Sequence, residues 1–204
     1  MIGRLIQAAR RFFGHGLGRR VRFPVDRLGY VLETSGGERY RLYRETRLDR
    51  ARDTGEGAVV SFRLSVPSDS LAAGLRSALF DPISNIATPF FAGQPGFRRK
   101  LWLAGSDGEF LELYEWDSQE DAERFVETLQ SVLRPFELLG TAKFEITENA
   151  TVEEFIRGSS MGWDGSARKP PMKSRLATAA VVGGLLLAAM LVIRTIGRRR
   201  QSSG

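Results

Sequence analysis

The segment from Gly96 to Trp116, GFRRKLWLAGSDGEFLELYEW, constrains the fold more than any other part of the sequence. Two runs of alternating apolar and polar residues flank a Gly-Ser-Asp-Gly turn, which is the pattern of a β-hairpin. Successive side chains of a strand point to opposite faces of the sheet, and this hairpin carries apolar side chains on both faces. Each face therefore needs a cover that keeps it from water.

Strict alternation divides the hairpin residues between the two faces. In the first strand, one side holds Phe97, Leu101 and Leu103, and the other holds Arg98, Lys100 and Trp102. In the return strand, Leu111 and Leu113 oppose Phe110, Glu112, Tyr114 and Trp116. The sequence does not fix the register across the turn, so which rings meet stays open.

The segments around the hairpin alternate between strand and helix patterns. Residues 58–66 form an apolar strand, and Pro67 opens a helical pattern that Asp81 and Pro82 interrupt. Ser118 begins a second helix, and residues 141–148 alternate as a final strand. Strand, helix, strand, strand, helix, strand is the order of a ferredoxin-like α+β domain, expected here over residues 58–158. Both helices should cover one face of a four-stranded antiparallel sheet.

The other face of that sheet would leave aromatic rings in water. Burial of a large ring is worth roughly 2–3 kcal/mol, so several exposed rings would be costly. We therefore predict a homodimer in which two sheets face each other as a barrel, with an interior lined by Trp102, Tyr114 and Trp116. Two alternatives stay open, since an N-terminal hairpin or a lipid surface could cover the same face.

Three stretches between Ala58 and Glu148 carry a family resemblance: PGFRRKLW at 95–102, LYEWDSQEDAERF at 113–125 and GTAKFEI at 140–146. The chain resembles the dimeric α/β-barrel (ferredoxin-like) superfamily, particularly its monooxygenase branch and uncharacterised actinobacterial members. The resemblance covers under half of the chain. It implies a cofactor-independent monooxygenase in which an aromatic or quinol-like substrate, held as its anion, reacts directly with oxygen.

Such a site needs an anion-stabilising donor and an apolar pocket. The ligand-binding residues that the resemblance implies are Asn85, Arg98 and Trp102 as donors, with Tyr114 or Trp116 as a wall. Each has a structural alternative. Asn85 could cap the interrupted helix, the tryptophans could fill a core, and Arg98 could pair with Glu112.

The sequence argues against a metal or cofactor. It has no cysteine and a single histidine, His15, so thiolate sites and clusters of imidazole ligands are excluded. The acidic residues of 115–123 coincide with a helix start, where carboxylates favour the helix dipole, so they do not indicate a metal site. Superfamily members that hold haem commonly use a histidine, which the body lacks. We expect no metal and no cofactor.

The charges are unevenly distributed. Residues 1–22 contain six arginines and no acid, and residues 165–204 contain eight Lys or Arg and no acid. The intervening part contains 16 basic and 24 acidic residues. A nucleic-acid-binding domain needs a basic face on its folded part, so we predict no nucleic-acid partner.

A membrane anchor is expected near the C-terminus. Leu176 to Ile193, LATAAVVGGLLLAAMLVI, holds 18 residues without a charge. At about 1.5 Å per residue it spans about 27 Å, close to the hydrocarbon thickness of a bilayer. Arg194 can snorkel and extend the span, which gives a transmembrane helix over 176–196. A flexible tether over 159–175 should precede it and a basic tail over 197–204 follow it, with the flanking basic residues on lipid headgroups.

Orientation rests on the N-terminus, because each flank of the span carries four positive charges and the positive-inside rule does not decide. Residues 1–20 lack the continuous apolar segment of a secretory signal. We expect a single-pass protein of the cell membrane with its body in the cytoplasm. The same residues predict a basic amphipathic helix on the membrane surface, or alternatively a helix packed on the body or a frayed arm. Residues 21–57 predict a β-hairpin extension and a linker.

Two functions of different class follow. The first is a membrane-anchored protein that binds a small hydrophobic ligand or a partner at the bilayer. The alternative is the cofactor-independent monooxygenase. The sequence does not name the ligand.

Overall fold

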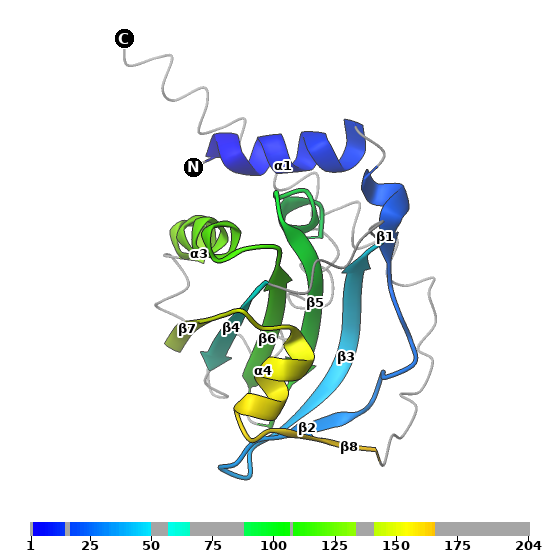
Figure 1. The fold of residues 1–204 in the computed structure, drawn as a ribbon, viewed down its shortest axis with the longest axis vertical. Coiled ribbons are helices and arrows are strands. Elements are labelled where there is room, and N and C mark those ends of the chain that lie inside the picture. The colour runs from blue at the N-terminus through cyan, green and yellow to red at the C-terminus, as the bar shows by residue number, and fades with distance from the viewer. Residues whose placement is uncertain are drawn as a thin grey trace.

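A computed structural model of the chain describes residues 2–14, 17–49, 57–65, 88–106, 108–133 and 141–165 (Figure 1). In these residues eight strands form one antiparallel sheet. The strands are β1 (Val21–Arg22), β2 (Val31–Glu33), β3 (Arg39–Leu48), β4 (Ala58–Ser65), β5 (Phe97–Ala104), β6 (Glu109–Trp116), β7 (Thr141–Glu148) and β8 (Gly162–Asp164). The helices are α1 (Ile2–Gly14), the 3-10 turn η1 (Leu17–Arg20), α3 (Gln119–Leu133) and α4 (Val152–Gly158). Residues 88–92 are also helical.

The strand order confirms the expected core. The sheet runs β7-β4-β6-β5-β3-β2-β8, with β1 paired to β3. Its first four strands have the arrangement of a βαββαβ unit, because the hairpin strands β5 and β6 are neighbours and β4 lies between β6 and β7. The fold is ferredoxin-like. Ser118 begins α3 as expected, since its hydroxyl accepts a hydrogen bond from the Asp121 backbone at 3.2 Å.

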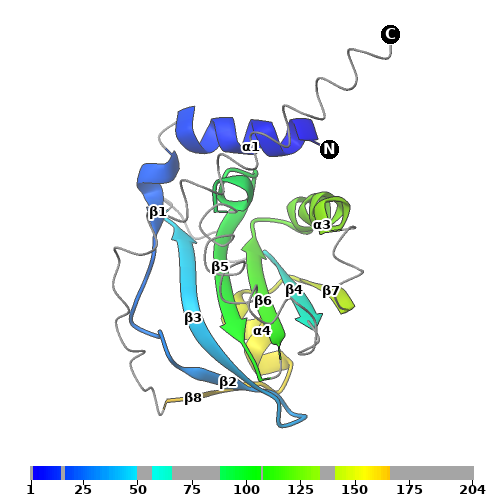
Figure 2. The same ribbon diagram turned by 180° about the vertical axis from the view of Figure 1, so that it is seen from behind.

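The N-terminal hairpin extends this sheet. β3 pairs with β5 along its length, and the short strand β8 pairs with β2 at the far edge. Gly162–Asp164, expected in the tether, is therefore part of the sheet. The sheet curves strongly along β3, so that β2 and β8 turn beneath the body (Figure 2).

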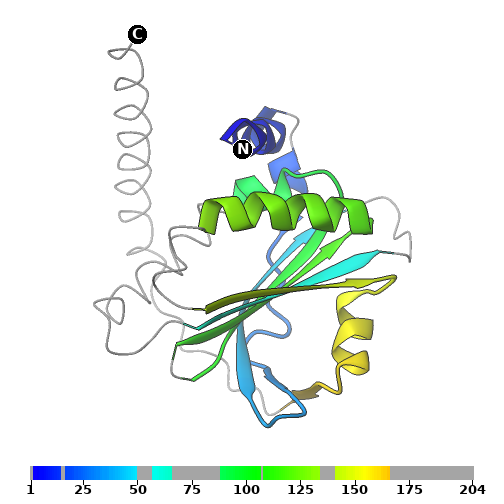
Figure 3. The same cartoon turned by 90° about the vertical axis from the view of Figure 1, so that its left-hand side faces the viewer.

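Both faces of the sheet are covered within one chain. Figure 3 shows α3 on one face and α4 on the other. The α3 face buries an aromatic cluster made of Phe62, Phe91, Phe97, Trp102, Tyr114, Trp116 and Phe125, with smaller apolar residues around it. The α4 face buries an aliphatic cluster made of Leu32, Leu42, Leu101, Leu103, Leu111 and Leu113 beneath Val152, Phe155 and Ile156.

This arrangement corrects the predicted position of the rings. Trp102, Tyr114 and Trp116 point toward α3, and each is at most 3% exposed in a single chain. The aliphatic side is the one that faces away from α3, and α4 with the curved hairpin covers it. The rings therefore do not require a second copy of the chain. The homodimer itself stays a prediction.

A β-bulge explains why Phe97 lies on the opposite face from the one predicted. The pairing between β5 and β6 shifts between Phe97 and Arg99, so Arg98 is an extra residue in β5. Strict alternation places Phe97 with Leu101, whereas the bulge moves it to the side of Lys100 and Trp102, opposite Trp116.

The short helix α4 follows directly from a local signal. The Thr151 side chain accepts from the Glu154 backbone, and the Glu154 carboxylate accepts from the Thr151 backbone, which is a complete capping box. Val152, Phe155 and Ile156 then share the face that covers the aliphatic cluster.

The basic helix α1 packs on the body. Ala8 is buried against Gly93, where an added Cβ would lie 2.0 Å from the Ala8 carbonyl oxygen. Phe13 is 73% exposed at the other end of the helix. The helix therefore packs on the body through Ala8, which is one of the predicted alternatives, and the Phe13 ring still projects into solvent.

Several predicted features lie outside the described residues. They include Asn85, the interrupted helical pattern after Pro67, the linker at 50–56, the expected transmembrane span 176–196 and the basic tail 197–204. In the described part of the chain, no helix is both long and apolar enough to cross a membrane.

Candidate functional site

The structure separates the predicted site residues. Trp102 and Tyr114 lie together on the α3 face around Phe91, with ring centroids 5.7 and 6.1 Å from that of Phe91. Trp116 lies deeper beneath α3, 4.7 Å from the Phe125 ring. Arg98 belongs to a different place, because the bulge directs it to a cavity on the α4 face.

Arg98 does not pair with Glu112 as its structural alternative proposed. Its Nε donates to Asp117 at 2.7 Å, and its Nη1 lies 3.6 Å from Glu115. The partner of Glu112 is Lys100, which the sequence analysis placed on a strand face without a role.

Lys100, Glu112 and Tyr114 form a buried hydrogen-bonded triad on the α3 face. Lys100 Nζ lies 2.8 Å from Glu112 Oε2 and donates to the Tyr114 hydroxyl at 2.6 Å. The Tyr114 hydroxyl donates to the same carboxylate oxygen at 2.5 Å. Lys100 is opposite Tyr114 in the register of β5 and β6, and Glu112 is two residues before Tyr114 on the same face. None of the three is more than 7% exposed.

Aromatic rings enclose the ammonium group of Lys100. Its Nζ lies 2.9 Å from the centroid of the Trp102 ring and 5.0 Å from that of Phe91. The Trp102 indole N–H donates to Thr46 Oγ1 at 3.3 Å, which fixes the ring. A buried cation over aromatic faces is stabilised by the ring quadrupoles.

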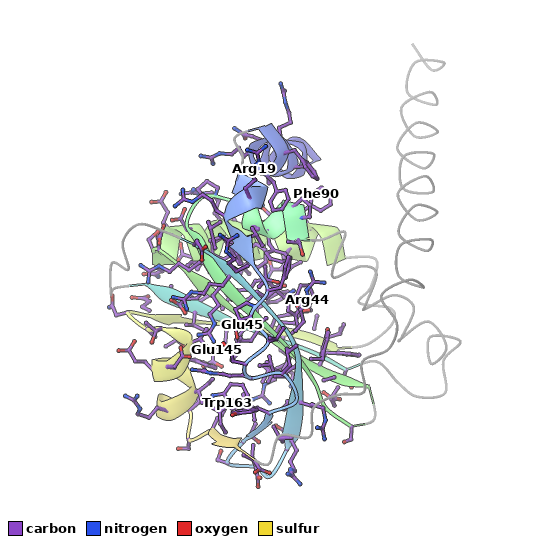
Figure 4. All side chains as sticks on the ribbon, turned by 90° about the vertical axis from the view of Figure 1, so that its right-hand side faces the viewer. Arg19, Arg44, Glu45, Phe90, Glu145 and Trp163 are labelled. Carbon is purple, nitrogen blue, oxygen red and sulfur yellow. The ribbon has the colours of Figure 1, made fainter. Side chains whose placement is uncertain are left out.

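Arg44 forms the outer side of this site. It lies 5.7 Å over the Trp102 ring and donates to Thr88 Oγ1 at 3.3 Å. Its neighbour Glu45 points the other way, toward α4, where it accepts from Arg99 at 2.8 Å (Figure 4). A second shift in strand pairing, between Leu42 and Arg44, precedes this pair in β3.

The environment changes the acidity of two of these groups. Burial lowers the pKa of Lys100 to about 7, although Glu112 acts in the opposite direction. Burial, together with the Glu112 carboxylate, raises the pKa of Tyr114 well above 10. Near neutral pH, the amine can therefore take up or release a proton while Tyr114 keeps its own.

The triad could not be recognised from sequence alone, because its three members meet only once the register is known. The available signal was a lysine on a strand otherwise rich in aromatic and aliphatic residues. In the described residues, no group of three or more His, Cys, Asp or Glu side chains is arranged to hold a metal ion.

Comparisons with known proteins concern the fold. No protein-family model matches the chain, and a search of curated proteins gives no match. One similar solved structure is an uncharacterised ferredoxin-fold protein related to antibiotic biosynthesis monooxygenases from Listeria monocytogenes. Its TM-score is 0.38 at 16% identity, over 56% of this chain and 66% of that one, so this chain spans slightly less than two thirds of its length.

Two further structures show a comparable likeness. A heme-degrading enzyme from Listeria monocytogenes aligns with a TM-score of 0.40 at 14% identity, over 63% of this chain and 96% of that one. A monooxygenase-like protein from Listeria innocua aligns with a TM-score of 0.37 at 15% identity, over 68% of this chain and 85% of that one.

Proposed function

We propose that the protein binds a small, weakly acidic aromatic molecule on the α3 face, beside Lys100. The observation that carries this proposal is the buried amine of Lys100 held between the rings of Trp102 and Phe91. The rings suit a flat aromatic ligand. The amine suits a phenol or another acidic group that gives up a proton near neutral pH.

The site also favours the anion of such a ligand. Lys100 becomes a cation when it accepts the proton, and Arg44 adds a guanidinium at the same aromatic wall. The Glu112 carboxylate, 2.8 Å from Lys100, acts against a second anion and keeps the nearby Tyr114 protonated, so the ligand's phenolate or enolate binds on the Arg44 side of Lys100. Tyr114 serves as a wall, as the resemblance implied, whereas Trp102 contributes its ring and not its N–H, which donates to Thr46. Arg98 and Trp116 lie elsewhere and are left out of the proposed site.

A second function, cofactor-independent monooxygenation, is favoured by the lowered pKa of Lys100. A base with a pKa near the working pH can remove a proton from a C–H group activated by an aromatic ring. The carbanion passes one electron to O₂, and the resulting radical and superoxide combine to a peroxide that takes a proton back from Lys100. Loss of water then leaves a carbonyl. One O₂ converts one CH₂ group to C=O plus H₂O, with no external reductant.

We further propose that the body is fixed to a membrane. This rests on the charge-free run from Leu176 to Ile193 and on the basic residues beside it. The described surface adds a second contact, because Phe13, Phe23 and Val25 are its exposed large apolar residues and all lie close to N-terminal arginines. A hydrophobic ligand dissolved in the bilayer would reach the site from there.

The test uses the full chain in detergent with anthrone, an aromatic ketone that has an acidic CH₂ group, as the probe. Binding is followed by quenching of tryptophan fluorescence, and turnover by oxygen uptake above the uncatalysed rate. Lys100→Met should weaken binding of the anion at least tenfold and abolish enzymatic oxygen uptake. Arg39→Gln, at the start of β3 beside the turn from β2, is the matched control and should change neither.

The outcomes separate the two functions. Saturable binding that depends on Lys100, without oxygen uptake, supports the ligand-binding function and contradicts the monooxygenase. Uptake of one O₂ per molecule of product supports both ligand binding and monooxygenation at this site. Anthrone that neither binds nor reacts, or binds equally well to Lys100→Met, would contradict the proposed site.

A further inference from the structure

A cavity lies on the α4 face, across the sheet from Lys100. Its volume is about 570 Å³, which is within the range of small-molecule sites. Five segments line it: the loop at 24–27, β3 with Asp49, β5, β6 and the start of α4. Its charged residues are the arginines Arg27, Arg47, Arg98 and Arg99 and the acids Asp26, Glu45, Asp49, Glu115 and Glu153.

The β-bulge in β5 builds the floor of this cavity. It turns the consecutive residues Arg98 and Arg99 toward the same side, and the side chains of both are at most 11% exposed. Arg99 is held by Glu45 at 2.8 Å and by Glu153 at 2.8 Å. Buried charges are costly even when paired, and bulges commonly re-aim side chains next to sites. Buried arginines beneath an open cavity do not favour stability of the fold. Ligand binding therefore explains them better.

Three arginines stand in a row across neighbouring strands on this face. Arg22 of β1 is directly opposite Arg47 of β3, and Arg47 is directly opposite Arg99 of β5. Like charges at directly opposite positions destabilise a sheet. Arg22 is compensated by Asp49 at 2.8 Å, and Arg99 by its two glutamates. The guanidinium of the central Arg47 is exposed and has no ion pair or hydrogen bond to any described residue, so an anion beside it would reduce the repulsion.

Asp26 is the second unmatched charge of the lining. The other charged side chains there are paired with each other or with a neighbour, as in the Arg27 to Glu153 pair at 2.8 Å and the Arg98 to Asp117 pair at 2.7 Å. Asp26 makes no such contact with the described residues. The cavity therefore offers one uncompensated cation and one uncompensated anion.

We propose that this cavity binds a small zwitterion. Its anionic group, a carboxylate or a phosphate, binds the guanidinium of Arg47, which can donate two parallel hydrogen bonds. Its ammonium group binds the carboxylate of Asp26. This site is independent of the aromatic site, because the two lie on opposite faces of the sheet.

Isothermal titration calorimetry on the full chain in detergent tests the proposal. The probes are alanine and O-phosphoethanolamine, compared with acetate, phosphate and ethanolamine, which carry only one kind of charge. At least one zwitterion should bind ten times more tightly than any singly charged probe. Arg47→Gln and Asp26→Asn should each raise its Kd at least tenfold, whereas Arg39→Gln, whose guanidinium pairs with Asp164, should leave it unchanged.

A second measurement distinguishes Arg47 from a merely structural residue. Without ligand, Arg47→Gln should raise Tm by about 1–3 °C, because the row of arginines loses its central charge. Zwitterions that bind no better than phosphate or acetate, or binding that survives Arg47→Gln, would overturn the proposal. Lys100→Met should bind the zwitterion normally, so failure at this site is distinguishable from failure of the aromatic site.

Discussion

Replacing Lys100 by methionine tests whether the triad on the α3 face is an energetically coupled unit. Methionine has a similar length and volume, so the packing against Trp102 is kept while the charge is removed. The substitution leaves the Glu112 carboxylate only 7% exposed with Tyr114 as its remaining hydrogen-bond partner. Removing one partner of a buried ion pair costs about 3–5 kcal/mol. We expect about 3 kcal/mol at pH 6, where Lys100 is charged.

The double variant should behave differently. Lys100→Met combined with Glu112→Met replaces the whole pair by apolar side chains, which in buried pairs is commonly neutral or stabilising. We therefore expect the double variant to be within about 1 kcal/mol of the parent chain, and each single variant to cost about 3 kcal/mol. The coupling energy between the two positions, the sum of the two single costs minus the cost of the double variant, is then at least about 5 kcal/mol.

The assay is urea unfolding followed by tryptophan fluorescence, on the full chain in detergent at pH 6. Arg124→Gln is the control, because Arg124 pairs with Glu120 at 2.7 Å on the exposed side of α3. Its loss should cost less than about 1 kcal/mol. A coupling energy below about 0.5 kcal/mol between positions 100 and 112 would refute the reasoning, because it would mean that the two charges do not depend on each other.

Three further outcomes are expected. The pKa of Lys100 is about 7 in the folded chain, below its value of 10.5 in the unfolded chain. Between these values the unfolded chain binds one more proton, so the free energy of unfolding should rise between pH 7 and pH 10. The rise is at most about 1.4 kcal/mol per pH unit and should be absent in Lys100→Met. Gly93→Ala should detach α1 and speed its amide hydrogen exchange, because the new Cβ would meet Ala8 at 2.0 Å, whereas Gly14→Ala, which has nothing within 4 Å, should not. A chain ending at residue 174 should leave the membrane fraction on ultracentrifugation, and continued sedimentation with membranes in high salt would contradict the C-terminal anchor.

The hairpin and the start of α3 could be predicted because each depends on local patterns, and the order of the four core strands follows from the βαββαβ succession of elements. Alternation gives strands, and Ser118 with Asp121 gives a helix start. The division of Lys100 and Trp102 from Leu101 and Leu103 was predicted correctly. The sides of Phe97 and Arg98 could not be predicted, because the extra residue Arg98 breaks the alternation without changing the composition of the strand. The same bulge separates Arg98 from the other expected site residues.

The helix α4 has a local sequence signal. Thr151 and Glu154 have the spacing of a capping box and precede Phe155 and Ile156. This helix covers the aliphatic face within one chain, so neither face of the sheet needs a second subunit as its cover. The triad needed more than this, because Lys100 and Glu112 come together only through the register between β5 and β6.

The three-residue pairing of β8 with β2 decides how the body would respond to a mechanical pull. At this outermost edge the last strand is held by three backbone pairs with β2, by the Arg39 to Asp164 ion pair and by the contact of Trp163 with Tyr30. A force transmitted along the chain from a lipid layer would separate β8 from β2 one residue pair at a time. The central strands would stay intact, so the edge would yield before the α3 face or the cavity on the α4 face is disturbed.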